Sequence, residues 1–388
     1  MNEKDYFNLM HVYLDAVFNP LLYDDSRIFM QEGWHYELTG KDTPIEYKGV
    51  VYNEMKGAFS TPTREMWYQI QKNLFPDNGY RFSSGGYPTA IPTLTYEAFV
   101  NFHKKHYHPS NSYIFLYGDA DVKKELEFID KEYLSKYEKS ENPVTVEENK
   151  PFADYKEISG SYPVMDGAPL ADQTYLVMNW VVGNGYDQTT VMALDILADV
   201  LVNQESAPVR KALLEAGIGK NVYATTQNML QNIFSIVVQN ANAADKDSFR
   251  AVVMNTLKKV AAEKIDRETL KGSLNRMEFR LREGDDAQKG LTYNMRVMTG
   301  WMFTDNPIPS LEYEKQLSDV KASVNNTYLE DLIRKDLVEN KYRLLLVLEP
   351  KTGLEKEIAQ KTSEELAALK KKMSPAELDS LVATTSKL

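Results

Sequence analysis

Residues 173–203 read QTYLVMNWVVGNGYDQTTVMALDILADVLVN, and this stretch decides the fold class. Its first part, Gln173–Val182, has the β-branched and aromatic content of a strand, and Gly183-Asn184-Gly185 supplies a turn. Its second part, Thr189–Asn203, has the length and apolar content of a buried helix. A strand that leads through a short turn into a buried helix predicts a protein in which sheet and helices pack on one another.

Further elements follow on both sides of this stretch. Downstream, the sequence predicts a helix at Pro208–Ala216, paired strands at Asn221–Gln227 and Asn232–Asn240, and a strand at Tyr342–Leu348. Upstream, the helical patterns are Tyr6–Phe18, Glu46–Gly57, Thr63–Leu74, Thr95–His106 and Asp121–Tyr137, with a strand at Tyr113–Tyr117. Beyond Pro350 the chain predicts two helices that Ser374-Pro375 separates.

A polar stretch marks the best candidate for a domain boundary. Lys139–Lys150 contains Pro143 and little apolar content, so a boundary falls near residue 150. One pattern occurs twice: Thr-Tyr begins a predicted helix, and that helix leads to an asparagine and then to a strand that begins near a tyrosine. The first occurrence starts at Thr95-Tyr96 and the second at Thr327-Tyr328. This echo is consistent with a duplicated domain whose first copy is the shorter one.

Composition excludes several classes of protein. The 388 residues include 56 acidic and 45 basic side chains, and a net charge of −11 argues against nucleic-acid binding, which needs cationic groups. The longest apolar run, Leu344–Leu348, is far short of the roughly 20 residues that span a bilayer, so we expect no membrane partner. Without cysteine, any metal would have to bind histidine or carboxylate. The compartment stays open, with the cytoplasm as the working expectation.

No complete catalytic motif is present in the sequence. His103, His106 and His108 lie close together, but their spacing and two intervening lysines favour a structural or solvated role over a metal cluster. Ser83-Ser84-Gly85-Gly86 lacks the lysine of a phosphate-binding loop, and neither a serine-nucleophile elbow nor His-x-x-Glu-His occurs. Glu54, flanked by apolar residues on a predicted helix, is by pattern alone more often an exposed residue than a ligand.

Four ordered motifs carry a family resemblance. They are Tyr47–Gly57 (YKGVVYNEMKG), Leu74–Asn78 (LFPDN), Ser84-Gly85-Gly86 and Tyr107–Asn111 (YHPSN). Together they resemble the insulinase-type (inverzincin, M16) zinc peptidases, on the branch of presequence protease and falcilysin. The resemblance implies an α+β fold of two related domains, each an antiparallel sheet with helices on one face. The domains would be residues 1–140, truncated at its start, and 150–350, with 351–388 beginning a helical linker.

The resemblance also implies a zinc site, of which this sequence holds one ligand. In that family two histidines of His-x-x-Glu-His and a later glutamate hold zinc, and the later glutamate corresponds to Glu54. A carboxylate suits this place because it is a hard anionic ligand that leaves one position of the ion open for water. Tyr52 and Asn53 flank Glu54 and are expected to orient it. Substrate-binding residues stay unassigned.

The histidine motif would lie upstream of Glu54 by more than the 53 residues that precede it. The resemblance therefore implies an internal fragment of a zinc-dependent endopeptidase that degrades short unfolded peptides, itself inactive, with no catalytic residue of its own. The alternative is a non-catalytic scaffold or partner subunit of the same fold. A sheet without its first strands would expose apolar surface, so self-association of the fragment is expected.

Overall fold

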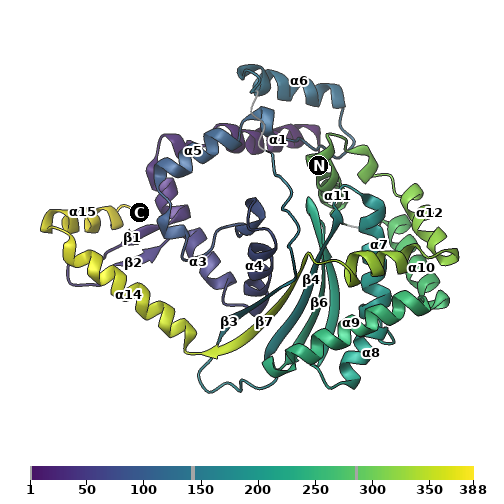
Figure 1. The fold of residues 1–388 in the computed structure, drawn as a ribbon. Coiled ribbons are helices and arrows are strands. Elements are labelled where there is room, and N and C mark those ends of the chain that lie inside the picture. Colours follow the sequence, from purple (N-terminus) through teal and green to yellow (C-terminus); the bar gives the residue numbers. More distant parts are fainter. Residues whose placement is uncertain (1, 141–144, 285–286) are drawn as a thin grey trace. The chain divides into compact units, whose positions relative to one another are not determined.

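The computed structural model describes residues 2–140, 145–284 and 287–388, and the chain divides into two compact units (Figure 1). The first unit comprises Met1–Thr61, Phe82–Thr145 and Glu355–Leu388, and the second comprises Pro62–Arg81 and Val146–Leu354. Within the described ranges, no helix has both the length and the apolar content that a membrane span requires.

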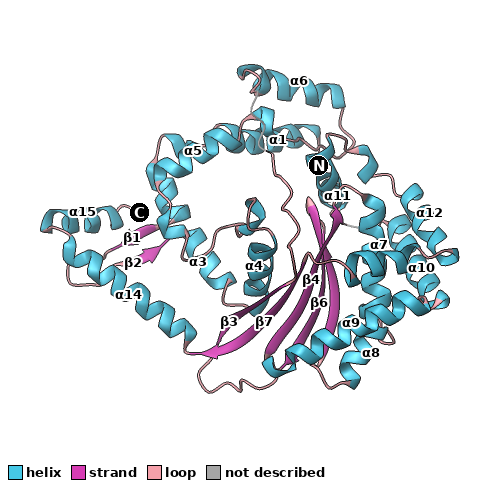
Figure 2. Cartoon of the chain, viewed as in Figure 1, coloured by secondary structure: helices cyan, strands magenta, loops and turns pink. Residues whose placement is uncertain are grey.

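Helices dominate the first unit, whereas the second is built on a sheet (Figure 2). The first unit contains α1 (Glu3–Phe18), α2 (Ser26–Ile28), β1 (His35–Glu37), β2 (Glu46–Lys48), α3 (Val50–Ala58), α5 (Tyr96–His106), α6 (Val122–Glu132), α14 (Leu354–Lys372) and α15 (Pro375–Thr385). The second contains α4 (Pro62–Leu74), β3 (Lys156–Val164), β4 (Thr174–Asn184), α7 (Gln188–Ala198), α8 (Pro208–Glu215), β5 (Asn221–Gln227), β6 (Gln231–Ala241), α9 (Lys246–Glu263), α10 (Arg267–Glu283), α11 (Lys289–Thr304), α12 (Glu314–Ala322), α13 (Tyr328–Leu332) and β7 (Arg343–Thr352).

The sheet of the second unit has five strands in the order β3-β7-β4-β6-β5. β4 pairs antiparallel with β6 and with β7, and β5 pairs antiparallel with β6. β7 lies between β3 and β4, which run in opposite directions, so its antiparallel pairing with β4 makes it parallel to β3. The sheet is therefore mixed, which corrects the expectation of a purely antiparallel sheet.

Both faces of this sheet are buried. Because side chains alternate along a strand, Met178 and Trp180 of β4 enter a core with helices α7 to α10, while Val177 and Val181 point to the opposite face. There Met66, Ile70 and Leu74 of α4 pack on them, and all three are fully buried. The hydroxyl of Tyr342 donates a hydrogen bond of 2.7 Å to the carbonyl of Leu74. Helices therefore cover two faces and not one, a second correction.

The outer edge of β5 is closed by side chains. The side chain of Asn203 accepts a hydrogen bond from the amide of Ala224 at 2.8 Å and donates one to its carbonyl at 3.0 Å. Arg210 donates to the carbonyl of Val222 at 2.6 Å. These backbone groups point away from β6, and an unpaired strand edge would offer them to another strand. The two side chains thus take the place of a sixth strand over the middle of β5.

The first unit is held together around the short β1–β2 hairpin. Leu38 and Ile45 form a small core with Leu366 of α14, and partly buried residues of α15 pack against it. Lys370 donates hydrogen bonds to the carbonyls of Lys41 and Thr43, at 2.5 and 2.6 Å. The segment 351–388, expected to begin a linker, therefore has most of its apolar face packed within the first unit.

Several local expectations are confirmed and others are wrong. The β5–β6 hairpin, the strand at residue 342 onward and the two C-terminal helices are present, and Ser374 with Glu377 forms a capping box at the start of α15. Residues 113–117 are not a strand, because no described strand of the first unit lies beside them to pair with. The centre of the predicted linker, residues 141–144, lies outside the described residues.

Replacing Asn203 by alanine should destabilise the second unit by about 1–3 kcal/mol, since it leaves the amide and carbonyl of Ala224 without their partner. Urea denaturation of N203A measures this loss. Asn221→Ala is the matched control on the same strand, because its side chain donates to the half-buried side chain of Gln239 and, among the described residues, to no backbone group. Equal unfolding free energies for the two variants would contradict the closed-edge interpretation.

Candidate functional site

Helix α3, which carries Glu54, begins at a position that only glycine can occupy. Gly49 has a φ of 142°, and a Cβ there would lie 2.3 Å from the carbonyl oxygen of Gly33. Backbone atoms cannot move aside as a flexible side chain can. The glycine thus lets the chain pass from β2 directly into α3, and it sets where Glu54 stands.

A second glycine motif packs against the same helix. Gly85 has a φ of 84°, and a Cβ there would lie 2.6 Å from the sulfur of Met55. Met55 is buried and follows Glu54 in the sequence. Two of the motifs that carry the resemblance, residues 47–57 and 84–86, therefore meet on the buried side of α3. Their glycines have a structural role at this contact.

Glu54 and Asn53 lie on the exposed side of α3, and Tyr52 is half-buried. The ring of Tyr52 contacts that of Tyr47, with 5.7 Å between ring centroids, and burial raises the pKa of the Tyr52 hydroxyl. Among the residues that the structure describes, no three histidine or carboxylate side chains gather closely enough to hold a metal ion. The residues present do not form a complete zinc site, and Glu54 is the one predicted ligand among them.

The clustered histidines take part in local packing. His103 shares hydrogen bonds with the hydroxyl of Tyr23 and the carbonyl of Val17, and burial lowers its pKa. His106 stacks on Phe102 with 4.2 Å between ring centroids. His108 accepts a hydrogen bond from the amide of Ser110 at 3.2 Å. These contacts give each of the three side chains a structural role.

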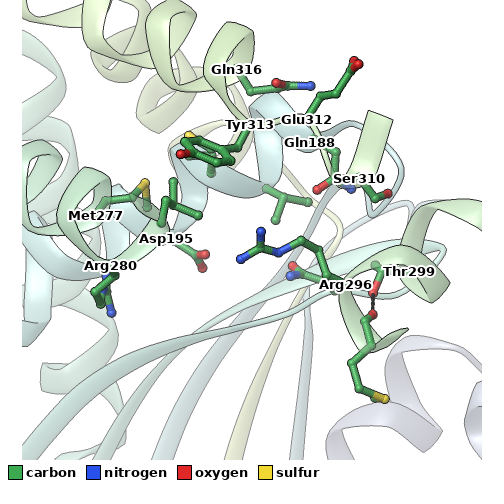
Figure 3. Close-up of a pocket in the computed structure, with 15 residues that line it drawn as sticks. Gln188, Asp195, Met277, Arg280, Arg296, Thr299, Ser310, Glu312, Tyr313 and Gln316 are labelled. Atoms are coloured by element: carbon green, nitrogen blue, oxygen red, sulfur yellow. Dashed lines mark hydrogen bonds between the residues drawn. The ribbon is translucent and has the colours of Figure 1, made fainter. Parts of the chain in front are cut away.

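A cavity of about 490 Å³ lies in the second unit, and sequence reasoning did not find it (Figure 3). Its walls come from α7, α10, α11, the turn between β5 and β6, and the segment 310–316. The volume lies in the range of small-molecule sites. The lining combines apolar side chains with charged and amide groups: Gln188, Val191, Met192, Asp195, Asn228, Met277, Arg280, Leu281, Met295, Arg296, Thr299, Ser310, Glu312, Tyr313 and Gln316.

Charged groups of both signs face this cavity. Partial removal from water raises the pKa of the Asp195 carboxyl. A hydrogen bond of 2.5 Å from the hydroxyl of Thr226 and the positive charge of Arg280 act in the opposite direction and lower this pKa. Figure 3 shows Asp195, Arg280 and Arg296 around the same hollow. No local motif signals this cavity in the sequence, because its residues come from five separate segments.

Comparisons with known proteins agree on one family. A family profile described as "Peptidase M16 inactive domain" matches residues 93–277. "Protein HypA" of Clostridium perfringens is 43% identical over 390 residues, covering 100% of this chain and 40% of that protein. "Presequence protease 1, chloroplastic/mitochondrial" of Arabidopsis thaliana is 34% identical, covering 95% of this chain and 36% of that protein. The chain thus spans about 40% or less of the length of these curated relatives.

Solved structures agree on the fold. The structure of a protease from Helicobacter pylori superposes with a TM-score of 0.62 at 15% identity, covering 78% of this chain and 70% of that one. A peptidase M16 inactive domain from Pseudomonas fluorescens superposes with a TM-score of 0.55, also at 15% identity, covering 78% and 70%. At this identity the likeness establishes an α+β fold of the M16 type.

Substituting Gly49 by alanine should lower the free energy of unfolding by about 3 kcal/mol or more, because the new methyl group overlaps a backbone carbonyl at a positive φ. Gly57→Ala is the matched control within α3, where a Cβ meets no atom within 4 Å, and it should gain up to about 1 kcal/mol. Thermal denaturation of both variants checks this contrast. Similar stabilities would show that Gly49 does not fix the start of α3.

Proposed function

The chain belongs to the M16 peptidase family, on its presequence protease-like branch, and from this we propose that it is a section of a zinc-dependent endopeptidase for short, unfolded peptides. The observation that carries the proposal is the exposed carboxylate of Glu54, on a helix whose position two motif glycines determine. An exposed glutamate on a helix fixed in this way can share a metal ion with ligands from other parts of the complete protein.

In this proposal Glu54 is the third zinc ligand of the complete protein. Among the described residues Glu54 belongs to no group of three side chains that could hold a metal ion, so the two histidines and the general base would come from sequence that this chain does not contain. Glu54 would be one of the residues that hold the zinc ion, whose bound water would have a lowered pKa and so supply the nucleophile for peptide hydrolysis. Tyr52 and Asn53, which flank Glu54, would orient that carboxylate. By itself the chain would be inactive.

The proposal includes a duplication of two related domains, residues 1–140 and 150–350, followed by residues 351–388 as the start of a connecting region. The echo of sequence supports it, since α5 begins after Thr95 and α13 begins after Thr327. In both places the helix leads to an Asn-containing turn and then to an extended segment. Only the second of these segments is a strand, β7, in the described structure.

Peptides would be the substrates of the complete protein. A peptide that pairs with the edge of a sheet is recognised mainly through its backbone, which gives broad sequence tolerance. The side chains that close the middle of β5 make that edge of the second unit's sheet a poor place for such pairing, which leaves β3 as the other edge strand. The net charge of −11 favours basic peptides over acidic ones.

The alternative function is a non-catalytic scaffold or partner subunit. The match to an inactive-domain profile and the incomplete metal site in the described residues are the observations that favour it. The DNA upstream of the codon for Met1 separates the two proposals: a His-x-x-Glu-His in the same reading frame favours the peptidase, and an authentic start without one favours the scaffold.

In the complete gene product, Glu54→Gln should lower zinc affinity and peptide cleavage by roughly 100-fold, because the amide is a weaker ligand than the carboxylate. Zinc content after dialysis and cleavage of a fluorogenic peptide measure the two effects. Glu97→Gln, an exposed glutamate in the first turn of α5, is the matched control and should retain both. Retention of zinc by E54Q would exclude position 54 as a ligand.

The isolated chain should self-associate through α1. Val12 and Tyr13 expose 54% and 68% of their surface, and Leu9 and Val17 add further exposed apolar area on the same helix. Light scattering after size-exclusion chromatography should show a mass that rises with concentration, and Val12→Glu with Tyr13→Glu should abolish the rise. Met165→Glu, which removes a more exposed side chain elsewhere, is the control. A monomer at all concentrations would refute this prediction.

A further inference from the structure

Two arginines stand apart from the others in this chain. The sequence contains twelve, and nine of them donate hydrogen bonds or form ion pairs with described residues. Arg64 also has an interaction partner. Arg280 and Arg296 have no hydrogen bond or ion pair in the described part of the chain, although the ring of Tyr293 lies 5.9 Å from the guanidinium of Arg296.

Both of these arginines line the same cavity of the second unit. Arg280 lines it from α10 and Arg296 from α11, and Figure 3 shows the carboxylate of Asp195 between the two side chains. A guanidinium has five donors in a planar fork that fits a carboxylate or phosphate. Two such groups that make no hydrogen bond or ion pair with the described residues, on the walls of one cavity, are the arrangement expected of an anion site.

We propose that this cavity binds the terminal carboxylate of a short peptide whose last residue is apolar. Arg280 and Arg296 would hold the carboxylate, and the methionine side chains at 192, 277 and 295 would contact the apolar residue. Methionine adapts its shape to different apolar groups, which suits a site that accepts many peptide ends. The amides of Gln188 and Gln316 can hydrogen-bond the peptide backbone.

The charge of the cavity favours a carboxylate over a phosphate. Asp195 and Glu312 line it together with the two arginines, so its walls carry no net charge when all four groups are ionised. A doubly charged phosphate would add an unbalanced negative charge next to Asp195, whereas a carboxylate adds only one. The apolar part of the lining also gives a phosphate ion no partner.

This inference rests on the proposed function for the identity of the ligand as a peptide, but the site itself is separate from Glu54. A site for chain ends would let the complete protein select peptides that have a free C-terminus. It would act on binding and not on the chemical step, because none of its residues is assigned a role at the metal.

The test compares one basic peptide that ends in leucine, prepared as the free acid and as the C-terminal amide. Isothermal titration calorimetry with the 388-residue chain should show that the free acid binds at least about tenfold more tightly than the amide. This is the range expected for charge-assisted hydrogen bonds. The double variant Arg280→Gln with Arg296→Gln should bind both peptides equally. Its thermal midpoint should change little, because among the described residues neither arginine makes a hydrogen bond or an ion pair, and only the ring contact of Arg296 with Tyr293 and the attraction of Arg280 to Asp195 would be lost.

Arg282→Gln is the matched control, since it removes the same charge from α10 at an exposed position where the arginine pairs with Glu278. R282Q should keep the preference for the free acid. Equal binding of acid and amide by the unaltered chain would overturn the proposal, and so would displacement of the free acid by equimolar inorganic phosphate. The two proposals can fail separately. If the chain prefers the free acid but the E54Q variant of the complete gene product still cleaves peptides, the cavity site is supported and the proposed role of Glu54 is refuted.

Discussion

Burial of both faces of strand β4 is the constraint on which the second unit depends. Its side chains alternate between two cores, with Trp180 on one face and Val177 on the other, and both are fully buried. Each large apolar side chain removed from water contributes about 1.5–3 kcal/mol, so leaving one face open would be costly. Helix α4 covers that second face, and this explains why residues 62–81 belong to the second unit.

Contacts within the first unit restrict the helix that carries Glu54. A Cβ at Gly49, where α3 begins, would lie 2.3 Å from the carbonyl oxygen of Gly33. A Cβ at Gly85 would lie 2.6 Å from the sulfur of Met55, on the buried side of the same helix. These two close contacts make α3 a suitable support for Glu54, the residue proposed as a zinc ligand.

The sequence predicted the elements with strong patterns and missed those with weak ones. Residues 173–203 and the β5–β6 hairpin have long apolar or β-branched runs, which single out one structure. Strand β3 reads KEISGSYPV, where Gly160 and Pro163 interrupt a mostly polar run, and only its pairing with β7 makes it a strand. Residues 113–117 show the reverse: the composition of a strand without a neighbouring strand.

The two candidate sites also differ in how well the sequence alone could predict them. Glu54 lies within a contiguous motif, so resemblance could point to it, whereas the cavity with Arg280 and Arg296 forms only when five segments meet.

The central claim is that Glu54 binds zinc in the complete protein, and anomalous diffraction at the zinc edge from crystals of the full gene product tests it most directly. The account predicts a peak about 2.0–2.2 Å from a carboxylate oxygen of Glu54. A zinc peak elsewhere, with Glu54 facing solvent, would contradict it.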